Sequence, residues 1–221
     1  MSQEDWTAVD SYLTEKLIAP DAALTAAMRA NAAANLPSID VTATQGKFLH
    51  LLARICGARR ILEVGTLGGY STIWLARALP AGGRLISLEF EPKHAAVATE
   101  NVRNAGLSDR VEIRVGAAAE SLDQLHAEGA APFDLIFLDA DKPNNAVYLE
   151  SSLRLSRPGT VILVDNVIRE GAILDLDSGD PSIQGTRRLF DALASHPQLD
   201  ATALQTVGSK GHDGFVLAMV K

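Results

Sequence analysis

Three glycines punctuate the run Glu63-Val64-Gly65-Thr66-Leu67-Gly68-Gly69-Tyr70-Ser71, which joins the aliphatic segment Arg60–Val64 to the amphipathic segment Tyr70–Leu79. Glycine between a strand and a helix permits a tight turn and close approach of a ligand to the backbone. The spacing differs from GxGxxG, the pattern that cradles the pyrophosphate of dinucleotides. The run therefore predicts a strand–turn–helix unit, either as a purely structural turn or as the wall of a site for another ligand.

The same alternation continues through most of the chain. Short aliphatic runs, which we interpret as strands, lie at Arg60–Val64, Arg84–Leu88, Val111–Val115, Phe133–Leu138 and Thr160–Val164. The amphipathic stretches between them, which we interpret as helices, lie at Tyr70–Leu79, Lys93–Ala105, Ala119–Ala127 and Asn144–Leu155. Apolar strands that alternate with helices predict an α/β fold, in which helices cover both faces of a parallel sheet.

The two ends of the chain extend this pattern. Ala-rich helices are predicted over Asp5–Ile18 and Asp21–Asn35, and a third helix starts at Thr42, which forms a capping-box pattern with Gln45. Beyond the polar stretch Arg169–Ser182, a helix is predicted over Ile183–Ala194 and strands over Ala201–Val207 and Phe215–Val220. The join Gly208–Gly214 is too short for a helical crossover, so the last two strands should be antiparallel. We expect residues 1–221 to form one domain.

Composition narrows the possible classes of protein. The formal net charge is −7 and no run of Lys or Arg occurs, so a nucleic-acid partner is not expected. No apolar run approaches the roughly 20 residues of a membrane helix, and the acidic start lacks the apolar region of a signal peptide. We therefore expect a cytoplasmic protein without a membrane partner. Cys56, the single cysteine, is expected to be a small buried side chain of the third helix.

An acidic residue closes the second predicted strand. Glu89 lies where a carboxylate can bind both ribose hydroxyls of an adenosyl ligand, although a solvated strand-end acid is the alternative. Together with the glycine turn, Glu89 favours an adenosine-type ligand. These two features do not separate S-adenosylmethionine (SAM) from NAD.

Carboxylates also follow the fourth and fifth predicted strands. Asp139 follows Leu138, and the pair Asp165-Asn166 follows Val164. Carboxyl ends of strands form the ligand-binding edge of open α/β sheets, and neighbouring strands lie about 4.8 Å apart, so these oxygens could converge. Such a set suits Mg²⁺ or Ca²⁺, whereas the absence of a His or Cys cluster disfavours a zinc site. Taken separately, Asp-Asn is also typical of a turn and Asp-Lys of a surface ion pair.

Lys142 follows Asp139 by three residues. A nearby divalent cation would disfavour its ammonium form, which makes Lys142 a candidate general base. A solvated lysine is the alternative.

At these residues the sequence resembles the bacterial branch of the cation-dependent class I SAM O-methyltransferases, the caffeoyl-CoA and catechol O-methyltransferase family. The strings that carry the resemblance are Gln45–Leu49, Ile61–Thr66, Gly69–Thr72, Phe133–Lys142, Asp165–Val167 and Gln205–Phe215. The resemblance covers residues 40–221. One departure is the segment Asn144-Asn145-Ala146, where many relatives have a tyrosine, and it bears on the substrate wall.

The resemblance implies a Rossmann-like fold with a seven-stranded, mostly parallel sheet, an antiparallel last strand and extra N-terminal helices. It implies SAM binding by Val41, Glu63, Gly65, Thr66, Ser71, Glu89, Ala118 and Asp139. It implies that Asp139, Asp165 and Asn166 bind a divalent cation, with Mg²⁺ expected in preference to Ca²⁺ or Mn²⁺. It also implies that Lys142 and Asp139 are catalytic residues. It also implies a homodimer.

The expected reaction is transfer of the SAM methyl group to a hydroxyl of a small catechol-like aromatic acceptor, which the cation orients and acidifies. Residues 1–40, as an acceptor-side lid, and the Arg169–Ser182 loop are expected to shape the acceptor pocket. The alternatives are a metal-independent methyltransferase, a SAM-binding module without catalysis and an NAD-dependent oxidoreductase. The missing GxGxxG pattern speaks against the oxidoreductase, and the complete set of metal-side residues speaks against lost catalysis.

Overall fold

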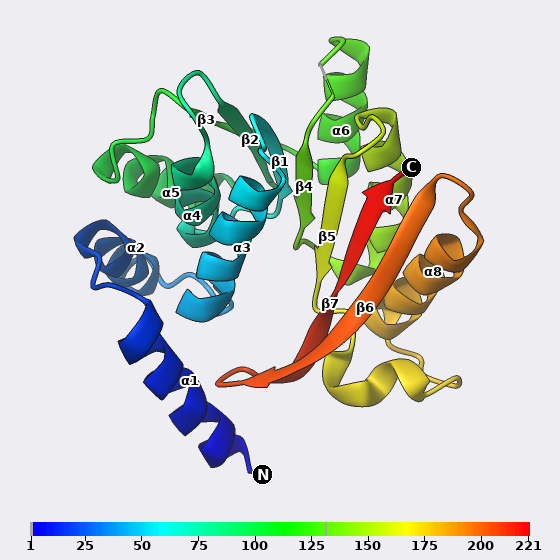
Figure 1. The fold of residues 1–221 in the computed structure, drawn as a ribbon, viewed down its shortest axis with the longest axis horizontal. Coiled ribbons are helices and arrows are strands. Elements are labelled where there is room, and N and C mark those ends of the chain that lie inside the picture. The colour runs from blue at the N-terminus through cyan, green and yellow to red at the C-terminus, as the bar shows by residue number, and fades with distance from the viewer. Residues whose placement is uncertain (1, 131) are drawn as a thin grey trace.

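A seven-stranded sheet organises the chain (Figure 1). The structure is a computed structural model that describes residues 2–130 and 132–221. The strand order is β3-β2-β1-β4-β5-β7-β6, and only β7 pairs in antiparallel fashion with its neighbours β5 and β6. The strands are β1 Arg60–Val64, β2 Arg84–Glu89, β3 Val111–Val115, β4 Leu135–Leu138, β5 Val161–Asp165, β6 Leu199–Gly208 and β7 Gly211–Val220. The expected sheet, with its antiparallel last strand, is confirmed.

Helices cover both faces of the sheet. Helices α3, α4 and α5 lie on one face, and α6, α7 and α8 lie on the other (Figure 1). The helices are α1 Gln3–Leu17, α2 Ala22–Ala33, α3 Ala43–Ile55, α4 Tyr70–Ala78, α5 Pro92–Asn104, α6 Ala118–Ala127, α7 Asn145–Arg154 and α8 Pro181–Ser195, with short 3₁₀ turns η1 Lys142–Asn144 and η2 Arg169–Leu174. This two-sided cover explains why the central strands β4 and β5 read as nearly continuous apolar runs.

Alternating side chains of each strand feed two separate hydrophobic cores. Ile61 of β1 packs with the α3 and α4 side, whereas Leu62 packs with the α6 and α7 side, and both are fully buried. Glu63 points to the same face as Ile61 because side chains alternate along a strand, yet it is also fully buried. The strand therefore carries a carboxylate into an apolar layer next to the glycine turn.

The connection between the last two strands is shorter than the sequence pattern indicated. Gly208 pairs with Gly211, so Ser209 and Lys210 alone form the turn. Residues Gly211–Gly214, which the pattern assigned to the loop, lie in β7. The glycines and Asp213 hid the strand because they lack the apolar signature of a strand.

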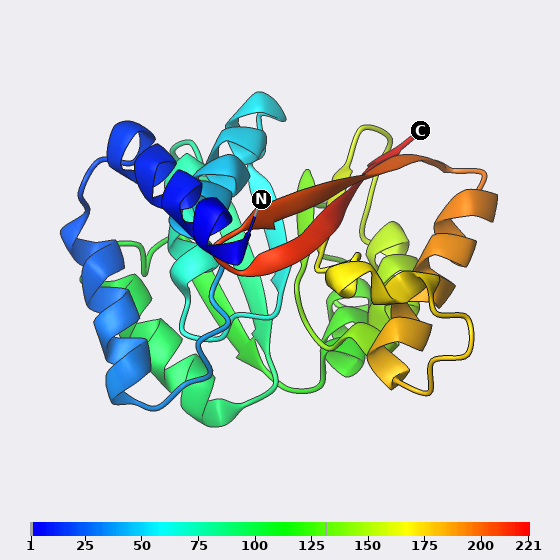
Figure 2. The ribbon, with the colours of Figure 1, turned by 90° about the horizontal axis from the view of Figure 1, so that it is seen from below.

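Helix α1 lies on the surface and has no buried residue. It begins with Ser2 as N-cap, and its first half lies beside the β6–β7 turn (Figures 1 and 2). The Gln3 side chain donates to the Gly208 carbonyl over 2.9 Å, and the Ser209 amide donates to Asp10 Oδ2 over 2.8 Å. Polar contacts to the hairpin therefore place this helix. Among the described residues, no helix is long and apolar enough to cross a membrane.

Candidate functional site

The glycine turn after β1 packs directly against the end of β4. Gly65 has φ +102°, a conformation that L side chains rarely adopt. A Cβ atom on Gly65 would also lie 2.7 Å from the carbonyl carbon of Asp139 and closer still to its oxygen. Glycine at this position therefore lets the turn reach the strand end that carries Asp139.

Glu89 holds the same turn from the β2 side. Its Oε2 accepts hydrogen bonds from the amides of Thr66, at 3.1 Å, and Leu67, at 2.8 Å, while its Oε1 accepts one from the Glu91 amide at 2.9 Å. His94 Nδ1 lies 3.5 Å from the same Oε1. The carboxylate thus fixes the backbone of the turn and also lines the adjacent cavity.

Glu63 lies behind the turn. Its carboxylate accepts hydrogen bonds from three hydroxyls, those of Ser71 at 2.6 Å, Thr72 at 2.5 Å and Ser87 at 2.7 Å. Burial raises the pKa of Glu63 from 4.5 to about 7, because the three hydroxyls only partly replace the lost solvation. Glu63 does not line the cavity, whereas its partner Ser71 does.

Asp139 and Asp165 approach each other at the ends of β4 and β5, which are neighbouring strands. Asp165 is buried, and burial together with the charge of Asp139 raises its pKa to about 7, against the opposing effect of Lys142. Lys142 Nζ lies 2.8 Å from Asp139 Oδ1 in a largely buried ion pair. Asn166 follows in the left-handed region at φ +57°, a conformation that Asn tolerates better than most residues.

A cavity of about 740 Å³ joins these groups. Nine of the residues singled out from the sequence line it: Val41, Gly65, Thr66, Ser71, Glu89, Ala118, Asp139, Lys142 and Asn166. Two do not, namely Glu63, which lies behind Ser71, and Asp165, the buried last residue of β5. The glycine turn, Glu89 and Ala118 form one half of the cavity, and Asp139, Lys142 and Asn166 form the other.

The oxygen atoms at the second half fit a hard divalent cation. The two negatively charged carboxylates repel each other, so a cation bound between them would stabilise both in the charged form. An amide oxygen completes a set of ligands that Mg²⁺ accepts. Within residues 2–130 and 132–221, no group of three or more His, Cys, Asp or Glu side chains forms a cation site. The candidate set therefore depends on Asn166 as its third ligand.

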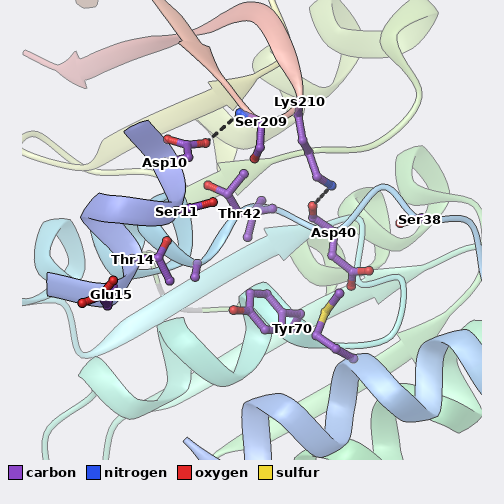
Figure 3. A pocket seen from close by; sticks show the side chains of 13 residues that line it. Asp10, Ser11, Thr14, Glu15, Ser38, Asp40, Thr42, Tyr70, Ser209 and Lys210 are labelled. Carbon is purple, nitrogen blue, oxygen red and sulfur yellow. Dashed lines mark hydrogen bonds between the residues drawn. The ribbon is translucent and has the colours of Figure 1, made fainter. Parts of the chain in front are cut away.

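A second cavity of about 550 Å³ lies on the other side of the Asp40–Val41 segment, which lines both cavities. Helix α1 lines it with Asp10, Ser11, Thr14 and Glu15, as Figure 3 shows. Lys210 of the β6–β7 turn donates to the Asp40 carbonyl and closes one side (Figure 3). Burial lowers the pKa of Lys210, whereas Asp40, Asp139 and Asp165 raise it. The ammonium group of Lys210 therefore interacts electrostatically with Asp139 and Asp165 at the edge of the sheet.

Asp40 and His94, which were not singled out from the sequence, line the main cavity beside the predicted residues. Arg169, the first residue of the loop expected to shape the acceptor pocket, lines it too, as does Tyr148, which follows the departure at Asn144-Asn145-Ala146. Tyr148 donates to Asp141, and burial and that carboxylate raise the pKa of Tyr148. Asp141 lies four residues before α7 and Tyr148 is the fourth residue of α7, so the 3₁₀ turn between them brings the two side chains together.

The third helix departs from the capping box. Thr42 is the N-cap and accepts a hydrogen bond from the Gln45 amide at 3.2 Å, as predicted. The Gln45 side chain, however, donates to Asp165 Oδ2 at 2.5 Å instead of turning back to Thr42. Cys56 is the C-cap of the helix and is only half-buried, not a core side chain. Burial raises the pKa of its thiol.

Comparison with known proteins decides the family. The model of the O-methyltransferase family matches residues 17–220. The chain belongs to this family. Its fold, including the strand order, is that of solved O-methyltransferase structures.

Two solved members of the family carry a donor or its product. The O-methyltransferase from Bacillus cereus, in complex with SAH, is 58% identical, with a TM-score of 0.98 and full coverage of both chains. The O-methyltransferase from Streptomyces achromogenes involved in tomaymycin synthesis, in complex with SAM, is 49% identical, with a TM-score of 0.96 over 100% of this chain and 99% of that one.

The name of one curated relative states the class of its methyl acceptor. A catechol O-methyltransferase from Niastella koreensis is 54% identical over the full length of both chains.

Proposed function

We propose that this O-methyltransferase transfers the methyl group of SAM to one hydroxyl of a catechol-like acceptor, with a divalent cation on Asp139, Asp165 and Asn166. One observation carries the proposal: a single cavity brings the glycine turn and Glu89 together with Asp139, Lys142 and Asn166. The complexes of the Bacillus cereus and Streptomyces achromogenes relatives with SAH and SAM support the donor. The Niastella koreensis relative, a catechol O-methyltransferase, supports the acceptor class.

The donor binds in the half of the cavity that the glycine turn forms. Glu89 is placed to accept from ribose hydroxyls, and the start of α6 at Ala118 offers backbone to the adenine. Gly65, Thr66 and Ser71 contact the methionine portion, and Val41 contributes an apolar side chain to the lining of the same cavity. Glu63 acts indirectly, because it accepts the Ser71 hydroxyl and thereby fixes its orientation.

The acceptor binds at the other half. Asp139, Asp165 and Asn166 would hold the divalent cation, which would supply Lewis-acid chemistry that lowers the pKa of an acceptor hydroxyl. Lys142 lies at the cavity wall, where its Nζ pairs with Asp139 Oδ1 at 2.8 Å. A cation on Asp139 would disfavour the ammonium form of Lys142, and the neutral amine would then accept the hydroxyl proton on its Nζ. The remaining contribution of the protein is alignment of the nucleophilic oxygen with the methyl group.

The surroundings of the cavity suggest where acceptor selectivity and assembly arise. Helix α1 lines the second cavity beside Asp40–Val41, so residues 1–40 act as an acceptor-side wall of the single domain over residues 1–221. Exposed apolar side chains, Tyr12 and Leu17 on α1 and Leu204 on β6, favour a homodimer. Light scattering that gives the monomer mass of 23.5 kDa would refute the dimer.

The test uses SAM with caffeate, dihydroxybenzoate and a catecholamine, in Mg²⁺ and in EDTA, with mass spectrometry as readout. We expect methylated product with Mg²⁺ and none with EDTA. Asp139→Ala should abolish the Mg²⁺-dependent product, whereas Asp191→Ala, at an exposed position of α8, should leave it unchanged. Product that survives EDTA and Asp139→Ala would support a metal-independent methyltransferase. SAM binding without any product would support a module without catalysis.

A further inference from the structure

The side chain of Gln45 reaches out of its own helix to an acid 120 residues further along the chain. Gln45 is the third residue of α3, where a capping box would turn its side chain back to the N-cap backbone. The Thr42 hydroxyl accepts the Gln45 amide, so half of the box forms. The Gln45 Nε2 instead donates to Asp165 Oδ2 at 2.5 Å. A local stabilising contact of the helix is therefore given up for a distant one.

This contact completes the orientation of a buried carboxylate. Asp165 Oδ1 accepts from the Asn166 amide at 2.9 Å, so each carboxylate oxygen has one fixed donor. A carboxylate accepts only, which means that the Gln45 amide must present its nitrogen and not its oxygen. Each oxygen retains lone-pair directions for a further partner. The two donors thus fix the orientation of the carboxylate and leave a lone pair on each oxygen free for a metal ion.

Gln45 itself is held in place from behind. The next residue, Gly46, packs on the indole of Trp74, since a Cβ there would lie 3.0 Å from Trp74 Cγ and nearer to other ring atoms. The start of α3 is thereby fixed against α4. A fixed helix start gives the Gln45 side chain a defined direction toward the sheet edge, which is what an orienting contact requires.

We propose that Gln45 is a positioning residue of the divalent-cation site, which orients the Asp165 carboxylate as a ligand. The proposal rests on the cation site described under the proposed function. Partners that orient metal ligands commonly contribute about 10- to 100-fold to metal affinity. Gln45 does not line the main cavity, so its substitution should change the affinity for the cation and not the affinity for SAM.

The test measures Mn²⁺ binding to the protein alone, without donor or acceptor, by electron paramagnetic resonance. Gln45→Met keeps length and apolar volume and removes the donor. We expect its Mn²⁺ dissociation constant to rise at least about tenfold. Gln45→Ala serves as a second variant, because alanine is the best helix former. Thr42→Ala is the matched control, since it removes the cap of the same helix without touching Asp165.

The expected pattern separates positioning from helix stability. Thr42→Ala should lower the melting temperature but keep the Mn²⁺ affinity within about twofold of the wild type, and both Gln45 variants should keep wild-type SAH affinity by calorimetry. Wild-type Mn²⁺ affinity in both Gln45 variants, with loss in Asp165→Ala, overturns the positioning role and leaves the cation site intact. Equal losses in Thr42→Ala and Gln45→Met also overturn it. Failure of the wild type to bind Mn²⁺ overturns the cation site itself.

Discussion

Replacement of Gly65 by alanine tests the contact between the glycine turn and the end of β4. Two costs combine at this position. The backbone has φ +102°, and a Cβ would meet the Asp139 carbonyl group. Because that group belongs to backbone at the end of a central strand, it has no rotamer by which to move away.

The size of the effect follows from these two costs. Holding a residue other than glycine in a sparsely populated backbone conformation costs about 1–3 kcal/mol. Forcing an extra methyl group into a packed site costs about 1–3 kcal/mol more. Gly65→Ala should therefore lower the free energy of unfolding by about 2–6 kcal/mol. Gly159 has φ +89° and open space around its Cβ position, so Gly159→Ala should lose only the backbone contribution.

Urea denaturation followed by circular dichroism, in EDTA and without ligand, gives both free energies. We expect Gly65→Ala to be clearly less stable than Gly159→Ala, and we expect only Gly65→Ala to lose SAH affinity. Equal destabilisation of the two variants would show that the approach of the turn to Asp139 contributes nothing. Normal SAH binding by Gly65→Ala would show that the turn does not need this approach to hold the donor.

Three further changes give distinct readouts. The folded-state pKa of Glu63, about 7, lies above its usual 4.5, so its contribution to stability declines by about 3 kcal/mol in total as pH rises from about 4.5 to 7. Glu63→Gln should remove this part of the pH dependence of the unfolding free energy, measured by urea titrations from about pH 5 to 8. An unchanged pH dependence in the variant would contradict the raised pKa. Lys142→Ala should lower the rate of methyl transfer about 10²- to 10⁴-fold with little change in SAH affinity, and an unchanged rate would exclude Lys142 as the base. Because burial raises the pKa of the Cys56 thiol, its reaction with a disulfide reagent at pH 8 should be slower than that of a free cysteine; reaction at the free rate would contradict the half-buried position.

The sheet was predictable because its signals are local. Strands β1 and β3 begin and end at the predicted residues, since both are short and rich in β-branched or aliphatic residues next to residues that favour turns. The convergence of Asp139, Lys142 and Asn166 on one cavity also followed from the rule that ligands bind at the carboxyl ends of parallel strands. The periodicity of apolar residues and the order of the elements along the chain are enough to predict both the strands and this convergence.

The remaining parts of the site depend on contacts between distant segments. Gln45 carries a strong local signal, that of a capping box, and tertiary structure overrides it through a buried acid. Lys210 and Asp40 are 170 residues apart, and no pattern in either neighbourhood indicates the other. Glu63 is the last but one residue of its strand, and only the positions of Ser71, Thr72 and Ser87 around it show why it is buried.

The two-residue turn between β6 and β7 has a consequence for how the chain matures. Helix α1 leaves the ribosome about 200 residues before its hydrogen-bonding partners Gly208 and Ser209 are made. With no buried residue of its own, α1 has little to hold it until β6 and β7 have joined the sheet beside β5. Lys210 can reach Asp40 only at the same stage, so the wall shared by the two cavities is fixed only after β6 and the following turn have been made. A nascent chain that already contains the glycine turn and the acids of β4 and β5 therefore still lacks the fixed wall of the donor cavity.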